Sequence, residues 1–298
     1  MLTADAEKVQ LEASELASLQ NLKSEVMKLL WGKETVVDTA LCTIISSGHL
    51  LIEDVPGVGK TTFIKGLARL IGLKVARVQC TSDLLPADII GVEVYNSATN
   101  SFDFHRGPIF TNVLIADELN RASPRTQSAL LEAMSEGRVT VDRTTHQLPT
   151  PFTVFASQNP TNSIGTYEIP ESQLDRFSAR IKIGYPEETG EMEILRSAAA
   201  DPLEGMPADV LSVESIHRLQ ANLEQVFLSD EVVGYAKRFI DETRNNNGIQ
   251  LGVSTRGGVI WLRMTKALAL LSGRNYVIPD DLQKLSQPCL AHRLITAT

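Results

Sequence analysis

Apolar and polar positions along the chain change their spacing several times, and each spacing predicts a different element. Within the first 30 residues, Leu19, Leu22 and Val26 recur at helical spacing, which predicts an amphipathic helix, and a second apolar helix is expected over residues 36–45. Further along, short apolar runs predict buried strands at 48–53, 75–80, 113–116 and 152–157, with helices at 60–70 and 124–135. Strands that alternate with helices favour an α/β fold, with a parallel sheet sandwiched by helices.

Two segments interrupt this alternation, and the last third of the chain no longer follows it. An Asn/Ser/Thr-rich turn divides residues 91–104 and a shorter turn divides 138–146, so both segments predict β-hairpins. Beyond about residue 186 the pattern is helical, with predicted helices at 213–226, 229–245, 255–271 and 279–294. We therefore predict an α/β core over residues 1–186, a linker over 187–210 and a small all-helical lid domain over 211–298.

The composition narrows the class of protein. With 298 residues, 43% hydrophobic and 21% charged, the chain is expected to form one large or two modest folded domains, which excludes disordered and fibrous classes. The 28 Lys and Arg residues stand against 36 Asp and Glu residues. The resulting net charge of −8 disfavours a generic electrostatic interaction with nucleic acid, although it leaves room for a local basic groove.

The sequence also indicates where in the cell the protein is expected. No run approaches the ~20 apolar residues of a membrane span, and the first residues lack the basic and apolar regions of a signal peptide. The three cysteines lie far apart without a CxxC pair, and the five histidines are scattered, so neither disulfides nor a His/Cys metal site is expected. We expect a cytoplasmic protein with no membrane insertion.

The strongest chemical signal is the segment 54–62, DVPGVGKTT, which lies between a predicted strand and a predicted helix. Gly57 and Gly59 allow backbone N–H groups to approach phosphate oxygens, and the helix N-terminus adds a positive dipole. Lys60 supplies a charge for the β- and γ-phosphates, and Thr61 supplies a hydroxyl for Mg²⁺. The alternative is an ordinary strand–turn–helix with a surface lysine, which the context disfavours.

Two adjacent carboxylates follow the predicted strand at 113–116. This position puts Asp117 and Glu118 at the C-terminal edge of the sheet, where ligands bind in open α/β folds. We expect Asp117 to hold Mg²⁺, directly or through water, and Glu118 to orient and deprotonate the attacking water. A solvated strand end is the alternative, but the phosphate loop upstream favours the catalytic interpretation.

Three further polar residues carry weaker signals. Asn159 ends a predicted strand and is placed to hydrogen-bond the γ-phosphate or the attacking water, or simply to form an Asn-Pro turn. Arg176 can act as a finger on a neighbouring subunit's γ-phosphate, although on sequence alone an ion pair with Asp175 or a glutamate is favoured. Arg256 lies in the first turn of a helix, against the helix dipole, which indicates either a phosphate ligand or a solvated arginine.

In this order, these elements resemble an AAA+ ATPase and, in detail, the MoxR family. The resemblance covers about residues 22–294 and rests on the strings PGVGKT (56–61), DELNRA (117–122), TQSALLEAM (126–134), QNP (158–160), QLDRF (173–177) and GYP (184–186). It implies nucleotide binding by Pro56, Gly57, Val58, Gly59, Lys60, Thr61 and Thr62 of the Walker A motif. It likewise implies Asp117 and Glu118 as Walker B, Asn159 as sensor 1, Arg176 as the arginine finger (with Arg121 and Arg180 as alternatives) and Arg256 as sensor 2.

The sequence departs from the family pattern at two places. Asp54 stands at the usual first glycine of the loop, and residues 31–34, expected beside the adenine, read WGKE where the family usually has VGQE. The two predicted hairpins match a hairpin inserted in helix 2 and one before sensor 1.

The resemblance implies a Mg²⁺-dependent ATPase that acts as a ring, expected to be a hexamer. Its expected output is chaperone-like remodelling or activation of a partner that carries a von Willebrand factor A domain. A nucleic-acid-stimulated motor and a magnesium-chelatase-type metal-insertion subunit are the alternatives. The motor is disfavoured because residues 91–104 contain no basic residue and the second hairpin contains only Arg138 and Arg143.

Overall fold

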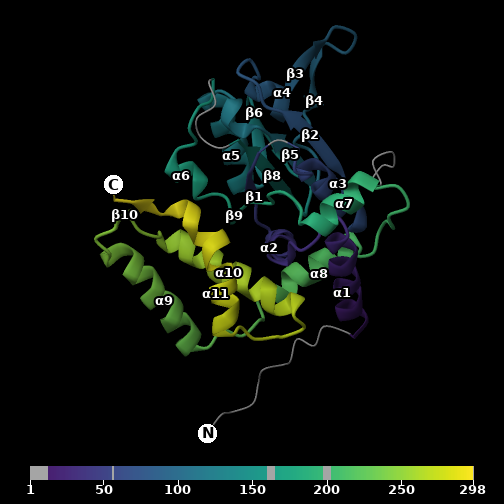
Figure 1. The fold of residues 1–298 in the computed structure, drawn as a ribbon. Coiled ribbons are helices and arrows are strands. Elements are labelled where there is room, and N and C mark those ends of the chain that lie inside the picture. The colour runs from purple at the N-terminus through teal and green to yellow at the C-terminus, as the bar shows by residue number, and fades with distance from the viewer. Residues whose placement is uncertain (1–12, 56, 160–164, 197–202, 298) are drawn as a thin grey trace.

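A five-stranded parallel sheet organises the first part of the molecule (Figure 1). The computed structural model describes residues 13–55, 57–159, 165–196 and 203–297. The strands, in spatial order, are β2 (Val75–Gln79), β5 (Val113–Asp117), β8 (Thr153–Gln158), β1 (Leu50–Glu53) and β9 (Ala179–Ile181). The predicted parallel sheet is confirmed. The sequence pattern did not predict β9, because three residues are too short to show a period.

Helices cover both faces of this sheet, because successive side chains along a strand point to opposite faces and both sets are buried under helices. Leu50 and Ile52 belong to one apolar cluster, and Leu51, between them, belongs to the other. The first cluster includes side chains from α1 (Ala13–Met27), α2 (Glu34–Ile45) and α3 (Lys60–Leu70). The second includes side chains from α4 (Pro86–Ile90) and α5 (Pro124–Glu136). The sandwich expected from the sequence is therefore present.

Both predicted hairpins are confirmed. β3 (Gly91–Asn96) pairs with β4 (Ser101–Arg106), and β6 (Arg138–Val141) pairs with β7 (Thr144–Gln147). The β3–β4 hairpin projects from the body of the molecule (Figure 1). Phe104 and His146 stack with ring centroids 4.0 Å apart, so the bases of the two hairpins are in contact.

The C-terminal part is a helical lid. It contains α8 (Val213–Leu223), α9 (Asp230–Asn245), α10 (Thr255–Leu271), α11 (Pro279–Leu290) and the short turn η2 (Ala291–Arg293). Three of the helices begin at a serine, because Ser212, Ser229 and Ser254 each accept a hydrogen bond from a backbone N–H in the first turn. A two-residue pairing of β10 (Ile249–Leu251) with β11 (Ile295–Thr296) was not predicted.

The lid packs against the N-terminal helices through an apolar interface. Ile44 of α2 and Trp261 and Met264 of α10 are buried in the same cluster, so core and lid share one hydrophobic interior. Lys284 of α11 also contacts the buried Asp38 of α2 at 2.6 Å. Shorter elements complete the chain: η1 (Leu119–Arg121), α6 (Glu171–Leu174) and α7 (Glu188–Arg196), which falls within residues 187–210. Among the described helices, none is long and apolar enough to span a membrane.

Candidate nucleotide site

The loop between β1 and α3 has the shape of an open cradle. Gly57 and Gly59 have φ angles of 87° and 82°, values that side-chain-bearing residues rarely adopt, and nothing lies within 4 Å of where a Cβ would stand on either. Val58, between them, is buried and anchors the loop to the core. Backbone N–H groups in such a loop can face an anion. Pro56, which the sequence also predicts to bind nucleotide, lies outside the described residues.

Lys60 begins α3 and turns back into this loop. Its Nζ donates hydrogen bonds to the carbonyl oxygens of Asp54 at 2.9 Å and Val55 at 3.1 Å. Burial lowers the pKa of Lys60, while the nearby carboxylates of Asp54, Asp117 and Glu118 act in the opposite direction. The lysine thus sits between the phosphate loop and the acidic pair. Thr61 and Thr62 follow in the first turn of α3, where both are half-buried.

Asp117 ends β5 and is buried at the C-terminal edge of the sheet. Its Oδ2 lies 2.6 Å from Arg77 Nε, and its Oδ1 accepts a hydrogen bond from Ser157 Oγ at 3.2 Å. Both partners come from neighbouring strands, β2 and β8. Neither role could be predicted from the sequence, because it depends on which strands are adjacent.

Glu118 has a strained backbone at the point where catalysis is predicted. Its φ is 56°, in the left-handed region that costs roughly 1–2 kcal/mol for a residue with a Cβ. The Glu118 N–H donates to Ser157 Oγ at 3.0 Å, which helps to hold this conformation. Such outliers cluster at functional sites, so the strain supports a functional role.

Three side chains surround the Glu118 carboxylate. Asn159 Nδ2 donates to Oε1 at 3.0 Å, and Gln79 Nε2 donates to Oε2 at 3.0 Å. Arg121 Nε lies 3.1 Å from the same Oε2. The structure therefore brings the predicted base and the predicted sensor together. We call this region, at the ends of β1, β5 and β8 with Lys60, Asp117 and Glu118, the phosphate edge.

The oxygen donors of the phosphate edge suit magnesium. Thr61, Asp117 and Glu118 offer only hydroxyl and carboxylate oxygens, the hard ligands that Mg²⁺ prefers. In the part of the chain that the structure describes, no group of three His, Cys, Asp or Glu residues could hold a metal by itself.

Asp54, at the usual glycine position, has a structural explanation. Its Oδ1 accepts a hydrogen bond from Val55 N at 2.9 Å, and its Oδ2 accepts from Ile183 N and Gly184 N, both at 2.6 Å. Asp54 as a whole residue is only 7% exposed. It therefore ties the start of the phosphate loop to the segment that follows β9.

Arg176 contacts its own core rather than the phosphate loop. Its Nη1 donates to Leu131 O at 3.0 Å and to Ser135 Oγ, both on α5. The ion pair with Asp175 that the sequence favoured does not form, because Asp175 pairs with Arg293 at 2.9 Å. The Nε of Arg176 is buried without a hydrogen-bond partner among the described residues.

Arg176 and Arg256 meet in one cavity. Together with Arg263, they line a space of about 270 Å³ between core and lid. His49 and Ser178, which directly precede β1 and β9, line it too, so the cavity lies at the N-terminal ends of the strands. We call this region, with Arg176, Arg256 and Arg263, the arginine edge.

The two edges are separated by the length of the sheet. Along β1, the five-residue step from His49 to Asp54 spans about 16 Å in an extended strand. The structure therefore does not bring Arg176 or Arg256 to the phosphate loop of the same chain. The alternative fingers lie nearer that loop, since Arg121 contacts Glu118 and Arg180 lies 3.5 Å from Glu53 at the end of β1.

Comparison with known proteins gives consistent matches along the chain. The model of the ATPase family associated with various cellular activities (AAA) matches residues 49–179, and that of the AAA lid domain matches residues 241–298. Chaperone MoxR1 of Mycobacterium tuberculosis is 37% identical, over 95% of this chain and 77% of its own. The chain belongs to the MoxR family of AAA+ ATPases.

Two further proteins are similar to this MoxR-family chain over most of its length. The uncharacterized protein YeaC of Bacillus subtilis is 44% identical, over 91% of this chain and 84% of its own. A crystal structure of a Cytophaga hutchinsonii protein, assigned provisionally as an ATPase, superposes with a TM-score of 0.86 and 33% identity, covering 95% of this chain and 88% of that one. In this MoxR-family chain, the AAA match spans the phosphate edge and Arg176, and the lid match spans Arg256.

Proposed function

We propose that this MoxR-family protein binds ATP with Mg²⁺ at the phosphate edge and hydrolyses it. The observation that carries the proposal is the meeting of an open glycine loop, Lys60 and the pair Asp117–Glu118 at one edge of the sheet. Lys60 and the loop N–H groups would bind the phosphates. Thr61 and Asp117 would hold Mg²⁺, which neutralises charge that develops on the phosphates during transfer.

In this proposal, Glu118 acts as the general base. Its carboxylate is oriented by three donors, so it is held ready to accept a proton from water. Asn159, bonded to the same carboxylate, is placed to orient that water or to contact the γ-phosphate. Arg121 and Gln79 hold the other carboxylate oxygen and limit its rotation.

We further propose that the protein works as a closed ring, with six subunits. Because the arginine edge lies at the far end of the sheet from the phosphate loop, Arg176 and Arg256 are better placed for a neighbour's nucleotide than for their own. Head-to-tail contacts that bring one subunit's arginines to the next subunit's loop close into rings. An arginine supplied in this way stabilises charge in the transition state.

The proposed output is chaperone-like remodelling or activation of a partner protein in the cytoplasm. Support comes from the chaperone name of the Mycobacterium relative and from apolar side chains exposed on the projecting hairpin, namely Val92, Val94, Tyr95 and Phe102. All three cysteines are buried free thiols, as expected in a reducing compartment. We propose a partner with a von Willebrand factor A domain.

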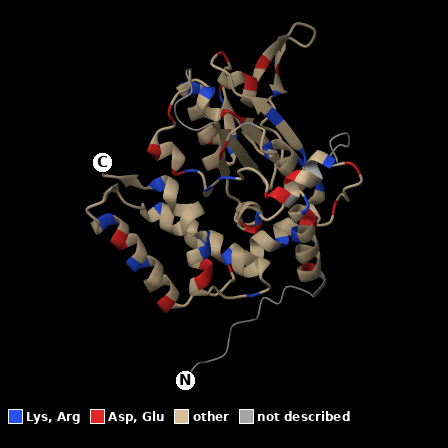
Figure 2. Ribbon diagram, viewed as in Figure 1, with Lys and Arg blue, Asp and Glu red and all other residues tan. Residues whose placement is uncertain are grey.

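The alternatives differ in the ligand that should stimulate hydrolysis. A nucleic-acid motor is disfavoured because basic and acidic residues are interspersed over the view in Figure 2 and because residues 91–104 carry no Lys or Arg. Hydrolysis rates measured with single-stranded DNA, with a porphyrin-insertion partner and with a von Willebrand-type partner separate the three. Stimulation by DNA alone would contradict the chaperone proposal.

The core of the proposal is tested by Glu118→Gln. This variant keeps the shape of the side chain but not the base, so it should bind ATP and hydrolyse it at least ~10²-fold more slowly. Glu132→Gln, an exposed glutamate of α5, is the matched control and should hydrolyse ATP at the parent rate. Phosphate release with and without Mg²⁺ is the measurement, and near-parent turnover of Glu118→Gln would assign the base to another residue.

A further inference from the structure

Arg293, at the end of η2, has a guanidinium that reaches from the lid into the core. Its side chain is almost fully buried, and its Nη2 donates to Asp175 O at 3.2 Å and to Phe177 O at 2.7 Å. These are the two residues on either side of Arg176. One nitrogen of the lid therefore holds the backbone on both sides of the proposed finger.

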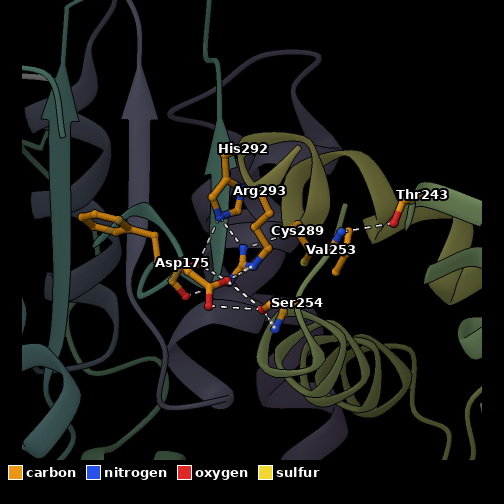
Figure 3. Close-up of polar contacts among 9 residues, drawn as sticks. Asp175, Thr243, Val253, Ser254, Cys289, His292 and Arg293 are labelled. Atoms are coloured by element: carbon orange, nitrogen blue, oxygen red, sulfur yellow. Dashed lines mark hydrogen bonds and ion pairs between the residues drawn. The ribbon is translucent and has the colours of Figure 1, made fainter. Parts of the chain in front are cut away.

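The other nitrogens of Arg293 complete a buried polar network (Figure 3). Its Nε lies 2.9 Å from Asp175 Oδ1, and its Nη1 donates to Cys289 O at 2.7 Å and contacts His292 Nε2. Burial and the adjacent Arg293 hold the pKa of His292 well below its usual value. His292 thus stays neutral, and Asp175 is the carboxylate that balances Arg293.

The same guanidinium lies against the helix that carries Arg256. A Cβ on Gly257 would stand 2.7 Å from Arg293 Cδ and 2.8 Å from its Nε, so only glycine leaves room there. Asp175 reaches this helix as well, since Ser254 Oγ donates to its carboxylate at 3.3 Å while capping Gly257 N at 2.9 Å. The Asp175–Arg293 pair therefore touches the immediate neighbours of both site arginines.

We propose that Arg293 is a positioning residue, which sets the distance between Arg176 and Arg256 across the boundary of core and lid. A buried ion pair is weak support for stability, because desolvation offsets its attraction, and its clearer effect is on geometry. A planar fork can bind the Asp175 carboxylate and two carbonyls at once, whereas a lysine ammonium cannot match this arrangement. The inference rests on the proposed function, in which the two arginines act on a neighbour's nucleotide.

The test replaces the planar guanidinium of Arg293 by an ammonium group of the same charge. Arg293→Lys should bind ATP within about twofold of the parent Kd, while its kcat falls at least about tenfold because the arginine edge is misplaced. Arg274→Lys is the matched control, since Arg274 makes a bidentate pair with Asp281, at 2.9 and 2.7 Å, at the other end of α10. Its kcat should stay at the parent value.

Mixed rings show which edge is damaged. Lys60→Ala subunits have an intact arginine edge, so they should restore hydrolysis at the intact loops of Arg293→Lys subunits. Subunits that carry both Lys60→Ala and Arg293→Lys should restore far less when mixed with Arg176→Ala subunits. Equal rescue of Arg176→Ala subunits by the single Lys60→Ala variant and by the double variant would overturn the inference, provided that labelling shows subunit exchange.

A second variant keeps the test decisive if Arg293→Lys does not fold. Gly257→Ala is favoured by helix propensity but pushes against Arg293, so it should lower kcat with little change in ATP affinity. Gly234→Ala in α9 is its control, because the nearest atom to an added Cβ there lies 3.5 Å away. Equal kcat values for the two alanine variants would overturn the inference.

The outcomes separate this inference from the proposed function. If Arg176→Ala hydrolyses ATP at the parent rate, the trans-acting finger is wrong and the positioning role is lost with it. If Arg176→Ala is impaired but Arg293→Lys and Gly257→Ala are both as active as the parent, the proposed function stands and the positioning role alone is overturned.

Discussion

The two edges of the sheet are built in different ways. The phosphate edge uses residues close to the ends of adjacent strands, and its key groups lie in two short segments, 57–62 and 117–118. The arginine edge combines two parts of the molecule, with Arg176 from the core and Arg256 from the lid, and Arg293 joins them. The carboxylates and the phosphate loop lie at one edge of the sheet, and Arg176 and Arg256 lie at the other. Each edge therefore holds half of the proposed site.

Because the two edges are built differently, different substitutions should impair each of them. The phosphate edge should respond mainly to changes in its own loops, because strand pairing holds them. The arginine edge should respond to anything that shifts the lid against the core. Variants at the two edges should therefore differ in which step they impair, ATP binding or hydrolysis.

The largest effect is expected at the centre of the phosphate edge. Lys60→Ala removes the cation that lies within the loop and should abolish ATP binding, as measured by calorimetric titration. Lys65→Ala, an exposed lysine one turn further along α3, is the control and should bind like the parent. ATP affinity equal to the parent in Lys60→Ala would refute the phosphate-loop assignment.

The arginine edge should affect hydrolysis without affecting binding. Arg176→Ala should bind ATP normally and lose ~10³-fold or more in rate, within the range of an arginine finger. Mixed with Lys60→Ala, it should regain activity, because each subunit type supplies the half that the other lacks. If exchanging rings do not recover, Arg176 does not serve a neighbour, and Arg121 or Arg180 becomes the next candidate.

Asp54 tests whether the phosphate edge also depends on distant contacts. Asp54→Gly restores the usual loop glycine but leaves Ile183 N and Gly184 N without their acceptor, so the free energy of unfolding should fall by about 3 kcal/mol. Urea denaturation measures this. Asp54→Asn keeps one acceptor oxygen, so its free energy of unfolding should fall by less. If Asp54→Gly is as stable as the parent, the hydrogen bonds from Ile183 N and Gly184 N contribute nothing to stability.

The smallest effect concerns pH at the arginine edge. Burial lowers the pKa of His49 to about 4 from 6.5, and its Nδ1 accepts from Val154 N while its Nε2 donates to Met134 O. Between these values the unfolded chain binds a proton that the folded protein does not, so His49 stabilises less as pH falls from 6.5 toward 4. The loss between pH 7.5 and 5 should be about 2 kcal/mol.

The matched variant for this pH effect is His49→Gln. Glutamine can accept and donate at similar positions but does not titrate, so unfolding curves of the variant should show a shallower pH dependence by that amount. An identical pH dependence in parent and variant would contradict a buried neutral His49.

Local pattern was enough to predict much of the molecule. The longer helices, both hairpins and four of the five sheet strands could be predicted because periodicity and turn residues act over short stretches of chain. The short helices α4 and α6, and α7 within the expected linker, were not predicted. The Gly57–Lys60 loop and the Asp117–Glu118 pair could be found because their chemistry lies in adjacent residues. The sheet edge then follows from parallel pairing, which places the ends of neighbouring strands together.

Most of the helices and strands, and the chemistry that the phosphate edge offers, follow from the sequence alone. It is the packing of the folded chain that lets Asp54 accept hydrogen bonds from amides 129 and 130 residues away and that brings Arg176 and Arg256 to one cavity. The same packing lets Arg293 bind the backbone on both sides of Arg176 and lie against Gly257, the neighbour of Arg256. These contacts join residues whose separation leaves no period or motif in the sequence. Their geometry depends on how the lid packs on the core, which is set by the shared apolar interior rather than by any local pattern.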